Sequence, residues 1–168
     1  MCAIAPRLSK SRQKATLEQA LTAVDNLQDD YAKATALCVV VLHLPKTDIA
    51  LLKHARVAAD TIVNPIGKVV ALSNIAPRLP ESEQKALLEQ ALNVADTIKD
   101  DSWRAYALSR LAPCLPASDK DLLERALTTA DNLQDDTSKA NALSAIAPRL
   151  PAFDKGLLEQ ALTGVSRG

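Results

Sequence analysis

Apolar residues recur along most of the chain three and four positions apart, which is the spacing of an α-helix with one buried face. After Arg12 they fall at Ala15, Leu17, Ala20, Leu21, Val24 and Leu27. Short polar stretches containing Asp, Asn or Pro separate this stripe from the following ones, and no strand pattern occurs. The pattern predicts a short helix up to Leu8, a helix that follows Asp29, and helices near 12–26, 48–61, 65–78, 83–98, 101–114, 119–133, 136–149 and 154–166.

An eight-residue motif, Ser-Arg-Leu-Ala-Pro-Cys-Leu-Pro at 109–116, recurs along the chain. Close copies lie at 73–80 and 144–151, a worn copy at 2–9 and the most drifted one at 38–45. Repeats of about 35 residues are typical of stacked helical pairs that bury their apolar faces against neighbouring pairs. We therefore predict an all-α, right-handed α-solenoid of about four and a half to five helix-turn-helix repeats, or about nine to ten helices. It forms one domain over 1–168, with repeats near 1–28, 29–63, 64–99, 100–134 and 135–168.

Polar residues and prolines mark the predicted helix ends. Side chains that accept a hydrogen bond from first-turn N–H groups are favoured as N-caps, and we place them at Ser11, Asp29, Asn64, Asp100, Ser118 and Asp135. Asp30 also suits the positive end of the helix that it opens. Proline disrupts the preceding helical turn, which predicts a kink or an early helix end at Pro6, Pro77, Pro113 and Pro148. Leu42 takes this place in the second unit, so that helix should be straighter.

Composition narrows the class of protein. Apolar residues make up 48% of the chain but aromatic residues only 2%, so the core must consist of Leu, Ile, Val and Ala. Lys and Arg together number 20, as do Asp and Glu, and this balance lacks the basic footprint of a nucleic-acid-binding protein. No apolar run is long enough to span a membrane, and no signal-peptide pattern opens the chain. With three scattered cysteines, the sequence predicts a cytoplasmic protein without nucleic-acid or membrane partners.

Residues that carry catalytic or metal chemistry are sparse. His43 and His54 occupy positions that look solvent-facing, and no converging ligand set accompanies them, so we predict no metal site and no cofactor. Cys2 and Cys38 fill a small position held by serine in other units, where a packed thiol is expected. Cys114 takes an arginine position and is expected to be exposed. No base is placed to activate any of these thiols, and we predict that the protein is not an enzyme.

Four aspartates recur near the ends of the second helices, where a negative charge opposes the helix dipole. They are Asp25, Asp60, Asp96 and Asp131. A cation should compensate each one, and the candidates are Lys33, Lys68, Arg104 and Lys139, or the row Arg7, Arg78 and Arg149. We interpret the aspartates, with Arg78 and Arg149, as structural contacts between repeats. A binding role for the aspartates is the alternative.

Alignment of the units shows three rows that drift along the first helices. They are Ala32, Gly67, Trp103 and Ser138; Thr35, Val70, Tyr106 and Asn141; and Ala3, Val39, Asn74, Arg110 and Ala145. Spacings of three and seven put one member of each row on a common helix face. In the fourth unit that face carries Trp103, Tyr106 and Arg110, the residue types enriched in interface hot spots. We predict a partner-binding anchor there; the alternative is that Trp103 covers the Ala-rich surface of a neighbouring helix.

The two ends of the chain form a second candidate surface. Terminal repeats normally present a polar outer face, but the last predicted helix keeps an apolar one. The residues of this face are Leu157, Leu158, Ala161, Leu162 and Val165, and Phe153 takes the N-cap position that Ser118 holds in the previous unit. The first unit, with Ala3, Ile4 and Ala5, is incomplete. We expect the ends to dock onto another copy, giving a homo-oligomer; a fragment of a longer array is the alternative.

The repeat Asp-Asp-x-x-Lys/Arg-Ala-x-Ala-Leu-Ser-x-Ile-Ala-Pro-Arg-Leu-Pro, followed by Leu-Leu-Glu-Gln-Ala-Leu, covers nearly the whole chain. It resembles the α-solenoid superfamily, between HEAT-like and tetratricopeptide-like repeats, and is similar to helical repeats found beside bacterial NACHT or NB-ARC ATPases. That resemblance implies a module that senses or binds a partner. The tetratricopeptide Trp-Leu-Gly-Tyr signature and a Walker A motif are both absent, so neither clamp residues nor ATPase activity carries over.

These observations favour a non-catalytic scaffold or adaptor that binds a protein or peptide and associates with itself. Two alternatives are a structural self-assembling unit and a fragment of a larger sensor or ATPase protein. A single-stranded RNA reader, suggested by repeat length alone, is a weaker alternative because the charge balance opposes it.

Overall fold

The computed structural model describes residues 10–150, and every regular element among them is helical. This confirms the all-helical prediction for the described part of the chain. The α-helices are α1 (Lys10–Asp25), α2 (Asp30–His43), α3 (Ile49–Asp60), α4 (Pro65–Ile75), α5 (Glu81–Asp96), α6 (Asp101–Leu111), α7 (Lys120–Asp131) and α8 (Asp136–Ile146). Three short 3-10 helices follow α4, α6 and α8, namely η2 (Ala76–Arg78), η3 (Ala112–Cys114) and η4 (Ala147–Arg149).

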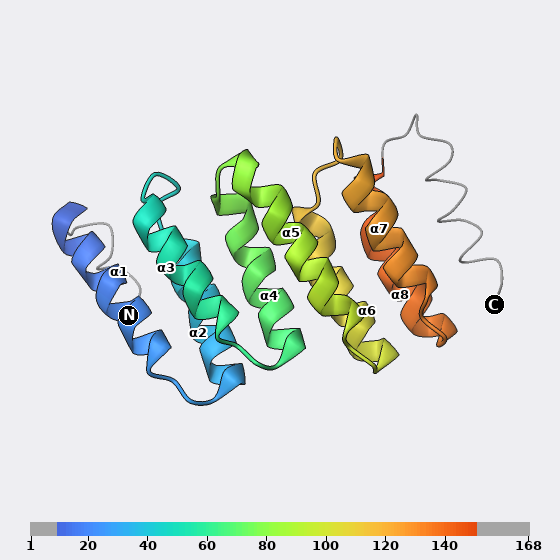
Figure 1. The fold of residues 1–168 in the computed structure, drawn as a ribbon, viewed down its shortest axis with the longest axis horizontal. Coiled ribbons are helices and arrows are strands. Elements are labelled where there is room, and N and C mark those ends of the chain that lie inside the picture. Colours follow the sequence, from blue (N-terminus) through green and yellow to red (C-terminus); the bar gives the residue numbers. More distant parts are fainter. Residues whose placement is uncertain (1–9, 151–168) are drawn as a thin grey trace.

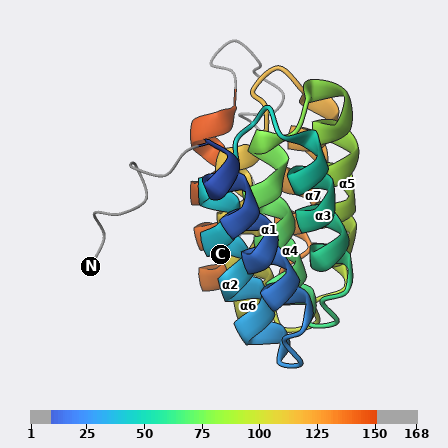
Figure 2. The ribbon, with the colours of Figure 1, turned by 90° about the vertical axis from the view of Figure 1, so that its left-hand side faces the viewer.

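The helices form two layers, and successive helix pairs follow one another along the long axis of the molecule (Figure 1). The first-helix layer consists of α2, α4, α6 and α8, in which each helix contacts the next. The second-helix layer consists of α1, α3, α5 and α7, with α1 beside α3 and α5 beside α7. In Figure 2, which looks at the molecule from the α1 end, α2 and α6 lie on one side and α3, α5 and α7 on the other. Side chains of one unit therefore meet side chains of the unit about 35 residues further on.

Side-chain caps begin most of the helices. Four of the six predicted N-caps are confirmed. Asp29, Asn64, Asp100 and Asp135 each accept a hydrogen bond from the backbone N–H three residues later. The prediction of Ser11 was wrong, because Ser11 lies inside α1. Ser118 was also wrong, since the carboxylate of the adjacent Asp119 accepts from Leu122 N and caps α7.

Helix α5 begins at Glu81, two residues earlier than the sequence predicts. Its first turn is built on Pro80, whose carbonyl accepts hydrogen bonds from the N–H groups of Glu83 and Gln84 at 2.9 and 3.0 Å. Pro80 offers no side-chain cap. Glu81 and Glu83 supply negative charge to the positive end of the helix instead.

The motif proline ends the first helix of its unit, as predicted for Pro77, Pro113 and Pro148. Helices α4, α6 and α8 each stop two residues before the proline, and a three-residue 3-10 helix carries the chain through it. Helix α2, which has Leu42 in place of proline, runs unbroken for 14 residues, against 11 for α4. The difference follows from the N–H group that proline lacks. Pro6 lies outside the described residues.

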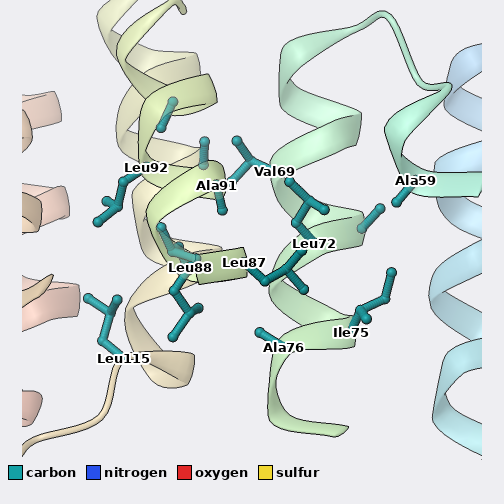
Figure 3. Close-up of a cluster of buried hydrophobic side chains, with 14 of the residues drawn as sticks. Ala59, Val69, Leu72, Ile75, Ala76, Leu87, Leu88, Ala91, Leu92 and Leu115 are labelled. Carbon is teal, nitrogen blue, oxygen red and sulfur yellow. The ribbon is translucent and has the colours of Figure 1, made fainter. Parts of the chain in front are cut away.

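The core runs between the two layers as one connected cluster of Leu, Ala, Ile and Val side chains. Figure 3 shows its centre, where Leu72 and Ile75 of α4 lie near Leu87, Leu88 and other residues of α5. All four of these side chains are fully buried. Each buried leucine or isoleucine stabilises the fold by about 1.5–3 kcal/mol relative to an exposed one. The described core contains no aromatic side chain.

Candidate partner-binding surface

An apolar groove of about 500 Å³ crosses the first-helix layer from α2 over α4 to α6. Tyr31 lines it from α2, Gly67 and Val70 from α4, and Trp103 and Tyr106 from α6. We call this feature the aromatic groove. The two drifting rows that the sequence identified, those of Gly67 with Trp103 and of Val70 with Tyr106, therefore meet at one surface feature.

Trp103 and Tyr106 form the α6 side of the groove as a paired unit. Their ring centroids lie 5.9 Å apart and their planes are almost perpendicular, at 89°. Edge-to-face pairs of this kind stabilise each other by about 0.5–1.5 kcal/mol beyond their burial. Trp103 is 53% exposed and Tyr106 45%, so each ring keeps about half of its surface for other contacts.

Tyr31, at the α2 end of the groove, was missed by the sequence analysis. It is 80% exposed, the largest exposed fraction of the three aromatic side chains in the groove. Its equivalents in later units are Ile66, Ser102 and Thr137, so its row also drifts. The variation along this row was visible in the sequence. However, Tyr31 lies two units before Trp103, and only the packing of α2, α4 and α6 brings the two rings to one groove.

Arg110 lies one helical turn beyond Tyr106 on α6 and is exposed. It does not line the aromatic groove itself. Its positive charge nevertheless acts on the thiol of Cys38, which does. Within residues 10–150, no carboxylate lies within salt-bridge distance of Arg110. The structure thus places Trp103 and Tyr106 in the groove and Arg110 near it, unpaired among the described residues.

The two described thiols are half-buried and packed against α4. Cys38 Sγ accepts a hydrogen bond from Asn74 Nδ2 at 3.3 Å, and Cys114 Sγ donates one to the carbonyl of Ser73 at 3.0 Å. Cys114 was predicted to be exposed, which is wrong, because its short side chain stays against the helix instead of reaching out as arginine does. Burial raises the pKa of both thiols, while nearby arginines act in the opposite direction. Both thiols therefore stay protonated at neutral pH and are poor nucleophiles.

No set of three His, Cys, Asp or Glu side chains that could hold a metal ion occurs among the residues the structure describes. In the same part of the chain no helix is long and apolar enough to cross a bilayer. What the described surface offers is an apolar groove with aromatic walls, a geometry suited to binding a side chain or segment by contact and burial.

Hydrogen bonds from backbone N–H groups to acidic side chains join consecutive first helices. Asp30 Oδ2 accepts from the N–H groups of residues 63–64 at 3.0 and 2.7 Å, just before α4. Asp101 Oδ2 accepts from those of residues 134–135 at 2.6 and 2.9 Å, just before α8. We call each such arrangement a carboxylate clamp. In α4 the corresponding residue is Pro65, which has no carboxylate, so the junction between α4 and α6 lacks this clamp.

Arginine side chains make a second kind of junction contact. Arg78 donates from Nη1 to the carbonyl of Leu44 at 2.7 Å and from Nη2 to that of Leu42 at 2.9 Å. Arg149 donates from Nε and Nη2 to the carbonyl of Leu115 at 2.9 and 2.7 Å. Both arginines thus bind the backbone of the preceding unit, an arrangement we call a guanidinium clamp.

Cys114 occupies the corresponding arginine position in the fourth unit. Its single contact to Ser73 cannot replace the two charged hydrogen bonds of an arginine. The junction between α4 and α6 is therefore the one described first-helix junction that has neither clamp, and the aromatic groove lies across it.

The recurring aspartates contact the next unit through partners other than those expected. Asp25 Oδ2 lies 2.6 Å from His54 Nε2, and Asp60 Oδ1 accepts from Gln90 Nε2 at 2.7 Å. Asp96 accepts from Thr129 Oγ1 at 2.8 Å, and its other oxygen lies 3.7 Å from Arg125 Nη2. The partners His54, Gln90 and Arg125 share one position in successive second helices.

The expected cations were therefore wrong for the described contacts of three of these aspartates. Lys33 Nζ donates to Thr61 Oγ1 at 3.2 Å, and Arg104 Nε to the carbonyl of Ile98 at 2.7 Å. Because each second helix lies in a layer of second helices, its C-terminal aspartate meets a side chain of that layer. Asp131 holds the same position in α7, but the chain that follows residue 150 lies outside the described part.

Several sequence candidates fall outside residues 10–150, and nothing is assigned to them. They are Cys2, Pro6, Arg7 and the proposed self-association residues Phe153, Leu157, Leu158, Leu162 and Val165. Comparisons of the chain with family models, with curated proteins and with solved structures found no match.

Proposed function

We propose that this chain is a non-catalytic interaction module, a right-handed α-solenoid whose aromatic groove binds a segment of a protein partner. The distribution of aromatic side chains carries the proposal. The whole sequence contains one Trp, two Tyr and one Phe, and Trp103, Tyr31 and Tyr106 all line the groove. The described core is built without any aromatic residue. Aromatic side chains placed at the surface and not in the core are typical of binding sites.

The groove offers a partner both burial and fixed geometry. The perpendicular packing of Trp103 and Tyr106 holds the two rings before a ligand arrives, which lowers the entropic cost of ordering them on binding. The remaining lining consists of small or aliphatic residues and a few uncharged polar ones. This composition suits an apolar side chain of a partner, and the resemblance to partner-binding helical repeats supports the same conclusion.

The experiment starts from peptides. A random peptide library displayed on phage is selected against the immobilised chain, and the enriched peptides are synthesised. Trp103 is the only tryptophan of the chain, so its fluorescence reports binding directly. We expect Tyr31→Ala to weaken the selected peptides by about tenfold or more, as hot-spot truncations do.

The matched control is Val57→Ala, which removes an apolar side chain that is 62% exposed on α3, in the other layer. This variant should bind as the unaltered chain does. Because Trp103→Ala has no tryptophan to follow, its binding is compared with that of the unaltered chain and of Tyr31→Ala by isothermal titration calorimetry. Selected peptides that bind equally well to all three proteins would refute the proposal. Light scattering on each variant verifies that the mass of the chain, and thus any association with itself, is unchanged.

A further inference from the structure

We infer that the aromatic groove takes a peptide segment whose apolar anchor is accompanied by a carboxylate, and that Arg110 binds this carboxylate. The inference rests on the proposed function and names the chemistry of the partner.

The lining of the groove itself carries no charged side chain. The acidic residues at the nearby helix starts are already engaged. Asp29 and Asp100 each accept a hydrogen bond from the N–H that they cap, and Asp30 accepts two at its clamp. A carboxylate at a helix N-terminus is further compensated by the helix dipole. These aspartates therefore offer little attraction for a basic partner.

Arg110 is in the opposite situation. It is exposed, and no acidic side chain of the described residues pairs with it. It follows Tyr106 by four residues, which is about 6 Å along the axis of α6. Its charge acts on Cys38, a residue of the groove lining contributed by α2. The spacing of four residues puts Arg110 on the same face of α6 as Tyr106, one turn beyond it.

A guanidinium without an internal partner favours a carboxylate, with which it forms two parallel hydrogen bonds. At the edge of an apolar groove such a pair is partly shielded from water, and each bond is stronger than on an open surface. An anchor side chain between Tyr31 and the Trp103–Tyr106 pair would place a neighbouring acidic residue, or a terminal carboxylate, within reach of Arg110.

The span of the groove sets the length of the segment that crosses it. Packed helices lie about 8–10 Å apart, so the distance from α2 to α6 is about 18 Å. An extended chain covers about 3.3 Å per residue, and about six residues cross it.

The peptides selected for the proposed function also test this inference. We expect an Asp, a Glu or the C-terminal carboxylate beside the aromatic or aliphatic anchor. Arg110→Gln should weaken these peptides by about tenfold, and the affinity for the unaltered chain should fall as salt is raised. Arg56→Gln, which removes the same charge from α3 in the other layer, should have no effect.

A charge exchange makes the test independent of any general loss of fold. Arg110→Glu should bind poorly to the acidic peptides, and a peptide with Lys in place of the acidic residue should restore its binding. This inference is overturned if the peptides whose affinity depends on Tyr31 lack a carboxylate, or if Arg110→Gln leaves their affinity unchanged. Either result leaves the proposed function intact. Peptides whose affinity is unchanged by both Tyr31→Ala and Trp103→Ala overturn the proposed function itself.

Discussion

The carboxylate of Asp101 accepts a hydrogen bond from the backbone N–H of Gln134, at 2.6 Å, although 33 residues separate them in the chain. Asp101 opens α6, whereas Gln134 belongs to the turn before α8. The same side chain thus begins its own helix and fixes the start of the next first helix. Contacts of this kind determine how each unit is placed on the preceding one.

Loss of this clamp should destabilise the protein. Asp101→Asn keeps the size of the side chain but replaces a charged acceptor of two hydrogen bonds by a neutral one. We expect the free energy of unfolding to fall by about 1 kcal/mol, measured by urea denaturation. Asp136→Asn is the matched control, because Asp136 opens α8 at the same position but holds no clamp among the described residues. Equal losses in the two variants would show that the clamp contributes nothing.

The guanidinium clamp that the α4–α6 junction lacks should be possible to add by mutation. Cys114→Arg gives the fourth unit the side chain with which Arg78 and Arg149 bind the preceding backbone. The equivalent acceptor is the carbonyl of Leu79, and we expect a gain of about 1 kcal/mol in the free energy of unfolding. Cys114→Met, which has no donor, serves as the control for side-chain size. The prediction fails if the arginine variant is no more stable than the methionine variant in urea denaturation.

Proline should be tolerated at position 42. Other units carry proline there, and Leu42 is exposed, so Leu42→Pro removes one hydrogen bond near the end of α2 and no core contact. We expect a cost below about 1 kcal/mol, against about 3 kcal/mol for Val39→Pro, which interrupts the same helix one turn earlier. Circular dichroism and urea denaturation measure both. Similar losses at the two positions would contradict this account of the motif.

The pH dependence of stability should reveal the pair of Lys14 and Asp48, whose charged atoms lie 3.0 Å apart. The hydrogen bond from Lys14, together with the N–H of Leu51, holds the pKa of the Asp48 carboxyl below its ordinary value. A carboxyl whose pKa is lower in the folded chain stabilises the fold above its unfolded pKa. That stability is lost as the pH falls through the folded pKa.

Asp48→Asn isolates this effect, since asparagine caps a helix as well as aspartate does. The unaltered chain should be more stable than the variant at pH 7, and this advantage should shrink below about pH 4, the usual pKa of an aspartate. Urea denaturation of both proteins between pH 7 and pH 2 gives the comparison. A difference that stays constant over that range would exclude the charge of Asp48 as its cause.

Local signals in the sequence account for most of the helices. These signals act within one or two helical turns, so they can be recognised without knowledge of the tertiary packing. They are the stripe of apolar residues, the caps at Asp29 and Asn64, and the motif prolines. Pro77 illustrates this, because the N–H that it lacks and its ring disturb the turn directly before it, where α4 ends.

Contacts between units could not be predicted in the same way. The charge pattern suggested Lys33 and Arg104 as partners of the recurring aspartates. The packing of the helices, however, determines which side chains lie within reach of each aspartate. Asp25 meets His54 because α1 lies beside α3. Tyr31 was overlooked for the same reason, since nothing within its own unit indicates that α6 brings Trp103 to the same groove. Asp30 was expected only to suit the dipole of α2, and its hydrogen bonds to the start of α4 needed the structure.

The junction between α4 and α6, with Pro65 and Cys114 where its neighbours have an aspartate and an arginine, has a mechanical consequence. The carboxylate and guanidinium clamps stiffen the α2–α4 and α6–α8 junctions. We therefore expect thermal bending to concentrate at the α4–α6 junction, as at a hinge between two stiffer blocks. Tyr31 belongs to one block, and Trp103 and Tyr106 to the other. Bending would widen or narrow the groove between Tyr31 and the Trp103–Tyr106 pair. A ligand that contacts both would restrict this bending. The spread of distances between spin labels on α2 and α6 should then narrow when a peptide binds.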